Sequence, residues 1–338
     1  MTMLNANPHS AQIMPRASIL LRPRDANDDR AYPALDSPLA FKEYFEREGF
    51  ILMRRAVQAP LCEGAKQAFL QEAFLDKQAF FVRHASGTYE RHVYTDQGFM
   101  KFPIMNLQDI SGKKYPQFKR RGLDLLTQVS IKRAMEVLFG EPGRMIHTMY
   151  FDGNQTTWAH RDGHYIDSEH AGAMVGVWVA AEDIHPDSGR FFILPRSHRM
   201  ALPGEDKNPN GPAYKAMMAQ FVREGPLDCV APILEQGDVL LWTSLTIHGS
   251  LPSTNPKFSR RSFTAHYVPQ SHQFKRQVAR HVAPRSIMVN DVAVSLQRDH
   301  DSLAGTLKDA LRSDFPRLYW MIRRAKETLS FAHSRAAQ

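Results

Sequence analysis

A succession of short segments rich in branched and aromatic residues fills much of the second half of the chain, and it constrains the fold most. Gly, Pro, Asn and Asp separate these segments, which is typical of strands joined by turns. The predicted strands are 145–151, 174–181, 190–194, 239–242 and 262–267. Short strands that follow one another in this way indicate a β-sandwich or a β-barrel.

Helical patterns precede these strands. The predicted helices are 38–48, 60–76 and 123–139. Ser37 and Pro38 fit the N-cap and the first position of a helix, and Gly49 would end it before a short strand at 50–53. Gly140 would end the third helix. We expect the helices to pack outside a sheet.

We divide the chain into three parts. Residues 1–35 are polar and irregular, and we expect a loose N-terminal arm. Residues 36–285 hold the predicted main domain, and residues 286–338 are predicted to form a helical, basic extension that packs on the core or on a partner. An insert at 200–227, with a possible helix at 214–223, interrupts the strands, and long loops of this kind are often lids or binding segments.

The composition is that of a folded globular protein, with 43% hydrophobic and 23% charged residues in 338. The chain has 43 Lys and Arg against 35 Asp and Glu, a formal net charge of +8. This surplus could favour an anionic substrate, an acidic lipid surface or nucleic acid, although a solvated basic surface is the simpler explanation. No nucleic-acid-binding motif accompanies the charge, so we do not expect a nucleic-acid partner.

The two cysteines, Cys62 and Cys229, exclude both a disulfide framework and a Cys-rich zinc site and fit a reducing compartment. The apolar run at 17–21 is too short for a signal-peptide core or for the roughly 20 residues that span a bilayer. We therefore expect a cytoplasmic protein, monomeric or homodimeric, without a transmembrane segment. Apolar and basic residues alternate at helical spacing in 317–329, which leaves peripheral membrane contact open beside packing on the barrel or in a dimer interface.

His160, Asp162 and His248 are the candidate metal ligands. His160 and Asp162 lie two residues apart in a region expected to be extended, so their side chains point to the same side. His248 follows the apolar strand 239–242, so a third ligand can come from another strand of the same barrel. Two imidazoles and one carboxylate are the protein ligands of the facial triad that holds non-haem Fe(II).

Spacing alone leaves this triad a hypothesis, because any one of the 15 histidines is more often a surface or core residue than a ligand. Several others fall in the same half of the chain: His147, His164, His170, His185, His198 and His266.

Longer segments resemble the phytanoyl-CoA dioxygenase family of iron(II)- and 2-oxoglutarate-dependent oxygenases. Residues 160–165, HRDGHY, are similar to the first metal motif of that family, and 187–198, DSGRFFILPRSH, to its turn, strand and Pro-x-Ser-His element. Residues 237–250 are similar to the distal strand with the second metal histidine, and 48–52 to the opening strand. The resemblance is strongest from about 145 to 268.

The resemblance implies a mainly β protein, with a double-stranded β-helix (jelly-roll, cupin-like) core and flanking helices. It implies that His160, Asp162 and His248 bind Fe(II), and that 2-oxoglutarate and O2 are converted to succinate and CO2 while a C–H bond of a small molecule is hydroxylated. Relatives that halogenate replace the carboxylate with a small residue, so Asp162 favours hydroxylation, with desaturation and ring closure still open.

Members of the family place an arginine about a dozen residues after the distal histidine, where it pairs with the far carboxylate of 2-oxoglutarate. Arg260 and Arg261 both fit, since a guanidinium fork suits a carboxylate. We favour Arg260, because Ser262 would lie on the same face of the strand and offer a second donor. Trp178 and Ser250 fall where the family lines the co-substrate pocket, although Trp178 would be buried in its strand in any case.

The residues that contact the substrate are less well defined. The candidates are His164, Arg83, Tyr94 and Lys101, within the segments 83–118, 163–172 and 200–227. Arg190 and Arg196 stand where the family more often has small or apolar residues. Either they add positive charge near the pocket or they lie outward on a basic surface.

The competing hypothesis is a cupin-like barrel that binds a metal or a sugar without redox turnover, since zinc also accepts His and carboxylate ligands. The pair formed by Arg260 and Ser262 and the length of the resemblance argue against it. Formation of succinate from 2-oxoglutarate would discriminate between the two.

Overall fold

The computed structural model describes residues 31–77, 81–83, 89–202, 211–276, 285–323 and 325. Its main feature is a large sheet with strand order β1-β9-β7-β11-β5-β14-β13, to which β4 adds beside β5. The strands are β1 (Phe50–Met53), β4 (Ile104–Met105), β5 (Gly143–Phe151), β7 (Val175–Ala180), β9 (Val239–Thr243), β11 (Ser262–Pro269), β13 (Arg285–Val289) and β14 (Val292–Leu296). Neighbouring strands are antiparallel except β14 and β5, which are parallel.

A smaller layer lies opposite the inner strands of this sheet. In it β10 (His248–Ser250) pairs with β8 (Phe191–Ile193), and single bridges add residue 160 beside β10 and residue 230 beside β8. The remaining pairs are β6 (Ile166–Ser168) with β12 (Phe274–Arg276) and β2 (Phe81–Arg83) with β3 (Tyr89–Arg91). The chain thus forms the two-layered β core that the succession of strands predicts.

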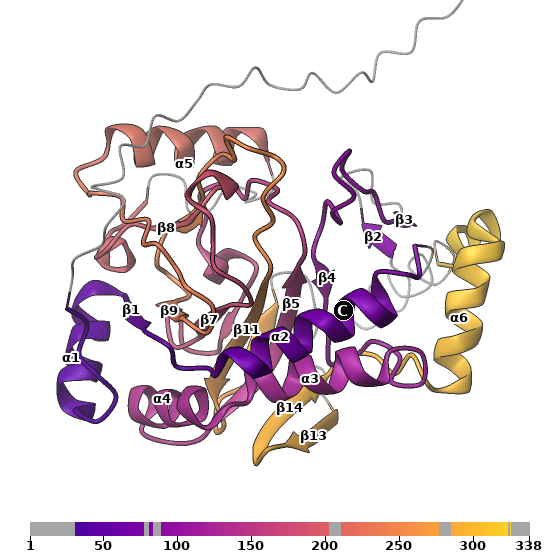
Figure 1. Ribbon diagram of the computed structural model, residues 1–338, viewed down its shortest axis with the longest axis horizontal. Helices are drawn as coiled ribbons and strands as arrows, with labels where there is room; N and C mark the ends of the chain where they lie inside the picture. Colours follow the sequence, from indigo (N-terminus) through magenta and orange to yellow (C-terminus); the bar gives the residue numbers. More distant parts are fainter. Residues whose placement is uncertain are drawn as a thin grey trace, which may run out of the picture.

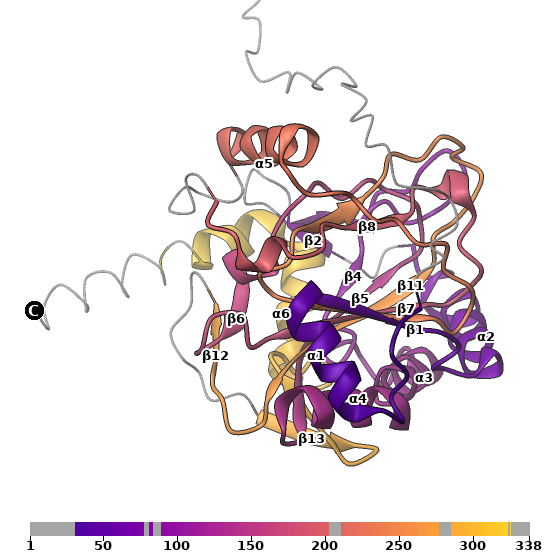
Figure 2. The ribbon, with the colours of Figure 1, turned by 90° about the vertical axis from the view of Figure 1, so that its left-hand side faces the viewer.

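Helices cover the outer face of the large sheet, while β8 and α5 (Pro212–Glu224) lie on its other side (Figure 1). The covering helices are α1 (Pro38–Glu48), α2 (Ala59–Ala68), α3 (Pro116–Leu126) and α4 (Val129–Phe139). Figure 2, turned by 90°, again shows α5 and β8 on the side of the sheet away from α4. The expectation that helices pack outside a sheet is therefore correct.

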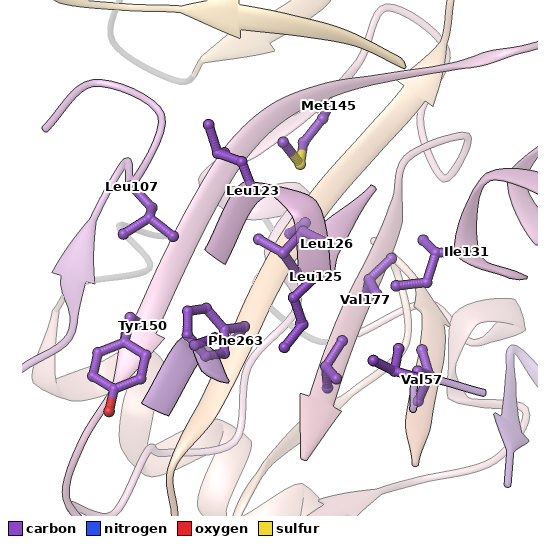
Figure 3. Close-up of a cluster of buried hydrophobic side chains, with 14 of the residues drawn as sticks. Val57, Leu107, Leu123, Leu125, Leu126, Ile131, Met145, Tyr150, Val177 and Phe263 are labelled. Atoms are coloured by element: carbon purple, nitrogen blue, oxygen red, sulfur yellow. The ribbon is translucent and has the colours of Figure 1, made fainter. Parts of the chain in front are cut away.

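The outer face of the sheet is apolar and the inner face near β11 is polar. Phe263, Ala265 and Tyr267 of β11 belong to the large hydrophobic cluster under the helices, part of which Figure 3 shows with Leu123, Leu125 and Leu126 facing Met145, Val177 and Phe263. The alternate residues of β11, Ser262, Thr264 and His266, are buried as well, although they face the other way. A strand buried on both faces with polar residues on one of them indicates that the polar face lines an interior site.

Two of the predicted helices differ from the structure. The segment 123–139 is not one helix, because α3 ends at Leu126 and α4 begins at Val129. Thr127 turns its hydroxyl back to the carbonyl of Leu123 at 2.8 Å, and Gln128 is extended, with φ −57° and ψ 149°. The segment 60–76 is α2 followed by a π-helical turn at Phe69–Ala73.

The helix ends follow the predicted signals more closely. Gly49 and Gly140 end α1 and α4 in the left-handed region, with φ of 78° and 74°. Pro38 is the first residue of α1, but the hydroxyl of Ser37 makes no capping hydrogen bond. The helix predicted at 214–223 is confirmed as α5.

The C-terminal part does not become helical at once, so the predicted boundary at 285 is wrong in this respect. β13 and β14 form a hairpin whose turn residues Asn290 and Asp291 have φ of 48° and 61°, as a type I′ turn requires. Because β14 pairs with β5, the hairpin belongs to the main sheet. Only then does α6 (Leu303–Asp314) begin, followed by helical residues 316–323. Most of the predicted N-terminal arm lies outside the described residues.

Candidate metal centre

His160, Asp162 and His248 meet between the two layers. His160 ends an extended segment, Asp162 opens a short 3-10 turn, and His248 opens β10. The amide of each histidine donates a hydrogen bond to the carbonyl of the other, both at 3.0 Å, which fixes the two backbones side by side. One ligand atom of each of the three side chains lies within 4.8 Å of the others. Asp162 Oδ1 lies 3.4 Å from His160 Nε2 and 3.5 Å from His248 Nε2.

The backbone orients both imidazoles. His160 Nδ1 donates to the carbonyl of Trp158 at 2.8 Å, and His248 Nδ1 donates to the carbonyl of Thr246 at 2.9 Å. In a neutral ring this leaves the lone pair on Nε2, the atom that faces Asp162. The His248 ring is further held against Phe191, with the ring planes 4° apart.

Electrostatics favour the protonation states that bind a metal. Burial lowers the pKa of His248 to about 4, so the ring is neutral at physiological pH. Burial acts to raise the pKa of Asp162, but the adjacent His248 and His266 outweigh it and hold the pKa well below its ordinary value. Neutral imidazoles and an ionised carboxylate are the forms in which these groups coordinate metals. The donor set therefore fits Fe(II) bound by two nitrogens and one oxygen.

Arg260 is a buried cation, 4% exposed, next to the strands that carry the triad. It donates to the carbonyl oxygens of Gly189 and Gln155, and among the described residues it has no carboxylate partner. Burial lowers its pKa to about 10, which still leaves it charged. A buried charge without a counter-charge is costly, so the site fits a ligand that brings a carboxylate.

Arg261 is in a different situation. Its Nε donates to Asp152 at 2.9 Å and its Nη1 to Glu182 at 3.3 Å. Its charge is therefore already compensated by the protein.

The other predicted co-substrate residues also border the interior. Ser262 and Thr264 follow Arg260 at two-residue intervals on the inner face of β11, and the buried hydroxyl of Thr264 has no hydrogen-bond partner within the described ranges. Trp178 is the register partner of Thr264 on β7 and packs against Phe191 at 5.9 Å between ring centres. Ser250 accepts a hydrogen bond from the Thr157 amide at 2.8 Å, which ties β10 to the segment before His160.

The candidate substrate residues are not brought together. His164 lies two residues after Asp162, and its ring contacts Tyr214 of α5, whose hydroxyl is hydrogen-bonded to Nδ1. Tyr94 packs against the cluster on the outer face of the sheet, and Lys101 is exposed. Arg83 is in β2, and its side chain lies outside the described part of the chain.

The two arginines that depart from the family pattern have different surroundings. Arg190 is buried and donates to the carbonyl of Ala231 at 2.5 Å. Arg196 has a 63% exposed side chain 3.6 Å from Glu48. Arg196 thus points outward, whereas Arg190 connects β8 to the segment beside it.

The insert, predicted as a binding segment, contacts residues next to the metal motif. Arg161, between the two metal-motif residues, is buried and donates to the carbonyls of Ser197 and Met200 at 2.6 Å each. On α5, the ammonium of Lys215 lies 3.8 Å from the ring centre of Trp158, whose own ring centre is 6.1 Å from that of His160. Trp158 is 42% exposed.

The fold and the donor set define a class, the non-haem iron oxygenases that use 2-oxoglutarate and O2. Residues 45–262 match the phytanoyl-CoA dioxygenase (PhyH) family. The chain belongs to this family, as the sequence motifs predict. No curated protein matches the sequence.

Solved structures support the fold. The chain is similar to the epimerase SnoN in complex with Fe3+, alpha ketoglutarate and nogalamycin RO, with a TM-score of 0.54 at 16% identity, over 77% of this chain and 99% of that one. It is also similar to EctD from S. alaskensis with 2-oxoglutarate and 5-hydroxyectoine, with a TM-score of 0.53 at 18% identity, over 83% of this chain and 94% of that one. The carbocyclase SnoK matches with a TM-score of 0.53 at 16% identity, over 74% of this chain and 91% of that one. The predicted double-stranded β-helix is thereby confirmed.

Proposed function

We propose that this oxygenase hydroxylates a C–H bond of a small molecule, with His160, Asp162 and His248 as the iron ligands. The observation that carries the proposal is the convergence of two imidazoles and one carboxylate between the two layers of the β core. Asp162 argues against halogenation, since a retained carboxylate fills the position that a halide would need, while desaturation and ring closure stay open.

Each residue around the co-substrate has its own proposed role. Arg260 binds the far carboxylate of 2-oxoglutarate, and Ser262 supplies a second donor. Thr264, whose hydroxyl has no partner in the part of the chain that the structure describes, can donate to the co-substrate, while Trp178 and Ser250 form the walls of the pocket. Because Arg260 is buried, little water would weaken its ion pair with the co-substrate.

Iron held by His160, Asp162 and His248 would keep coordination positions open to the keto acid and to dioxygen. In the overall reaction, 2-oxoglutarate, O2 and R–H give succinate, CO2 and R–OH. One oxygen atom enters the new carboxylate of succinate and the other enters the product. No side chain of the chain need act as a nucleophile.

For the substrate we propose a small molecule with an anionic group, admitted beside α5. Lys215 and His164 supply polar groups at this entrance, and the exposed indole of Trp158 offers an apolar surface next to His160. The net charge of +8 would attract an anion to the protein. Tyr94, Lys101 and Arg83 are secondary candidates, because the described contacts do not direct them to the triad.

The function is tested by incubating the protein with Fe(II), ascorbate and 2-oxoglutarate under air and measuring succinate. We expect succinate that depends on iron and increases when anionic small molecules, but not their neutral esters, are added. The His170→Ala variant should form succinate at the wild-type rate. His170 follows the metal motif but packs against His272, at 4.7 Å between ring centres. No succinate above background with any candidate, together with no visible absorption band on anaerobic addition of Fe(II) and 2-oxoglutarate, would favour a binding protein without turnover.

For its location we propose the cytoplasm. Both Cys62 and Cys229 are free and buried, and burial raises the pKa of each thiol to about 12, which suits a reducing compartment. Within the described ranges, no helix is long and apolar enough to cross a membrane.

The C-terminal helical residues 316–323 are proposed to make peripheral contact with anionic membranes. Leu318, Met321 and Ile322 are 47%, 68% and 41% exposed, and Arg317 and Arg323 lie among them. Exposed apolar side chains beside cations are typical of interfacial helices. We expect deletion of 315–338 to reduce co-sedimentation with phosphatidylserine vesicles and to leave phosphatidylcholine vesicles unaffected. Unchanged co-sedimentation would contradict the proposal, and a change in oligomeric state instead would assign the helix to a dimer interface.

A further inference from the structure

The second oxygen of Asp162 does not face the two metal-motif histidines but is held by two other side chains. Asp162 Oδ2 accepts a hydrogen bond from Trp242 Nε1 at 2.8 Å and lies 3.2 Å from His266 Nε2. Trp242 and His266 are each only 2% exposed, so water does not compete for these contacts. The two oxygens of one carboxylate thus have different surroundings.

The contact to His266 extends to a third residue. An ionised carboxylate only accepts hydrogen bonds, so His266 Nε2 must carry the proton. His266 Nδ1 lies 3.2 Å from Nδ1 of His147, the register partner of His266 on β5, and where His266 carries its proton on Nε2 alone, His147 is the donor. His147 therefore fixes the tautomer in which His266 can donate to Asp162.

The position of Trp242 depends on a glycine. Gly176 of β7 is the register partner of Trp242 on β9. A Cβ atom at residue 176 would lie 2.3 Å from Trp242 Cε2 and 2.7 Å from Nε1, the donating atom. The indole therefore occupies space that only glycine leaves free at this position.

We propose that Trp242 and His266 are positioning residues that occupy both lone pairs of Asp162 Oδ2 and restrict the carboxylate to metal binding through Oδ1 alone. This inference rests on the metal site proposed above. Its consequence concerns the number of coordination positions of the metal ion that remain open to other ligands. Two imidazoles and one oxygen leave three of six positions free, as the keto acid and dioxygen together require, whereas a carboxylate bound through both oxygens would leave two.

The test compares Trp242→Phe, which keeps a ring but removes the donor, with Gly176→Ala, which displaces the indole. Tyr267→Phe is the matched control, because Tyr267 neighbours His266 on β11, faces the other side of the sheet and also loses one buried hydrogen bond, 2.8 Å to the Leu126 carbonyl. Each protein is titrated with Co(II) alone under anaerobic conditions, and its visible absorption spectrum and unfolding temperature are recorded.

We expect Co(II) spectra that differ from wild type in both Trp242→Phe and Gly176→Ala, and Co(II) binding weakened by roughly 10- to 100-fold, the usual effect of losing a partner behind a ligand. Tyr267→Phe should unfold at a lower temperature with a wild-type spectrum. The Trp242→Phe/Gly176→Ala double variant should be less impaired than the two single effects combined, because both act on the same hydrogen bond.

The spectrum decides the outcome. If Trp242→Phe retains the wild-type Co(II) spectrum, Trp242 only packs in the interior and the inference is overturned, while the metal site stands. If the wild-type protein itself binds no Co(II), the proposed metal site fails, and the inference fails with it.

Discussion

Asp162→Ala is expected to abolish iron loading and 2-oxoglutarate turnover. The loss of iron affinity and activity should be well above the roughly 100-fold that follows removal of a residue that hydrogen-bonds to a metal ligand. The alanine removes one of three protein ligands. It also leaves the donors of Trp242 and His266 without their acceptor in a space that water does not reach. Iron content after anaerobic reconstitution and the rate of succinate formation measure the two effects.

The control for this variant is another buried carboxylate. Asp238 has no exposed surface and accepts hydrogen bonds from Arg54, at 2.7 Å, and from the amide of Arg55, at 2.8 Å. Asp238→Asn should lower the free energy of unfolding but leave iron stoichiometry unchanged. Full iron loading in Asp162→Ala would show that the ligands lie elsewhere.

Arg260→Ala is expected to raise the KM for 2-oxoglutarate by a factor of about 30 to several thousand. Truncating one partner of a buried, hydrogen-bonded charge pair costs about 2–5 kcal/mol, much of it from the unpaired charge that remains. Arg260→Lys should fall between wild type and alanine, because the charge remains but the fork that binds a carboxylate at two points is lost. Initial rates at several 2-oxoglutarate concentrations give the comparison.

Arg261→Ala should act mainly on stability. It leaves Asp152, whose side chain is fully buried, without the ion pair of 2.9 Å, and breaking such a pair costs about 3–5 kcal/mol of unfolding free energy. Below its unfolding temperature its KM for 2-oxoglutarate should stay near wild type. A larger rise in this KM for Arg261→Ala than for Arg260→Ala would show that Arg261 binds the carboxylate of 2-oxoglutarate.

The strands and the metal motif could be predicted because their signals are local. Continuous runs of branched and aromatic residues mark buried strands such as β7 and β9. Because side chains alternate in an extended chain, a His-x-Asp spacing puts both side chains on one side. Arg260 could be preferred over Arg261 by the same alternation, and the structure gives the physical reason in the carboxylates that already pair with Arg261.

The residues behind Asp162 could not be predicted, because their contacts span about 80 and 104 residues of sequence. Trp242 looks like an ordinary core residue of a buried strand, and His266 is one histidine among 15. The available signal was the period-two series that begins at Arg260, just before β11, and continues through Ser262 and Thr264 to His266, since such a series places its polar side chains on one face.

Two of the errors in the predicted fold have equally specific causes. The break between α3 and α4 depends on Thr127, whose hydroxyl competes for a backbone carbonyl without disturbing the hydrophobic periodicity. The β13–β14 hairpin was missed because Asn290-Asp291 lacks the glycine that usually marks a type I′ turn, although both residues tolerate positive φ.

The central claim is that three side chains bind one iron ion in the interior of this barrel. It is tested most directly by anomalous diffraction from crystals soaked anaerobically with Fe(II) and 2-oxoglutarate. We predict one peak within bonding distance of His160 Nε2, His248 Nε2 and Asp162 Oδ1, with the co-substrate carboxylate on Arg260. A peak bound instead by His147 and His266, with Asp162 beyond bonding distance, would contradict the claim.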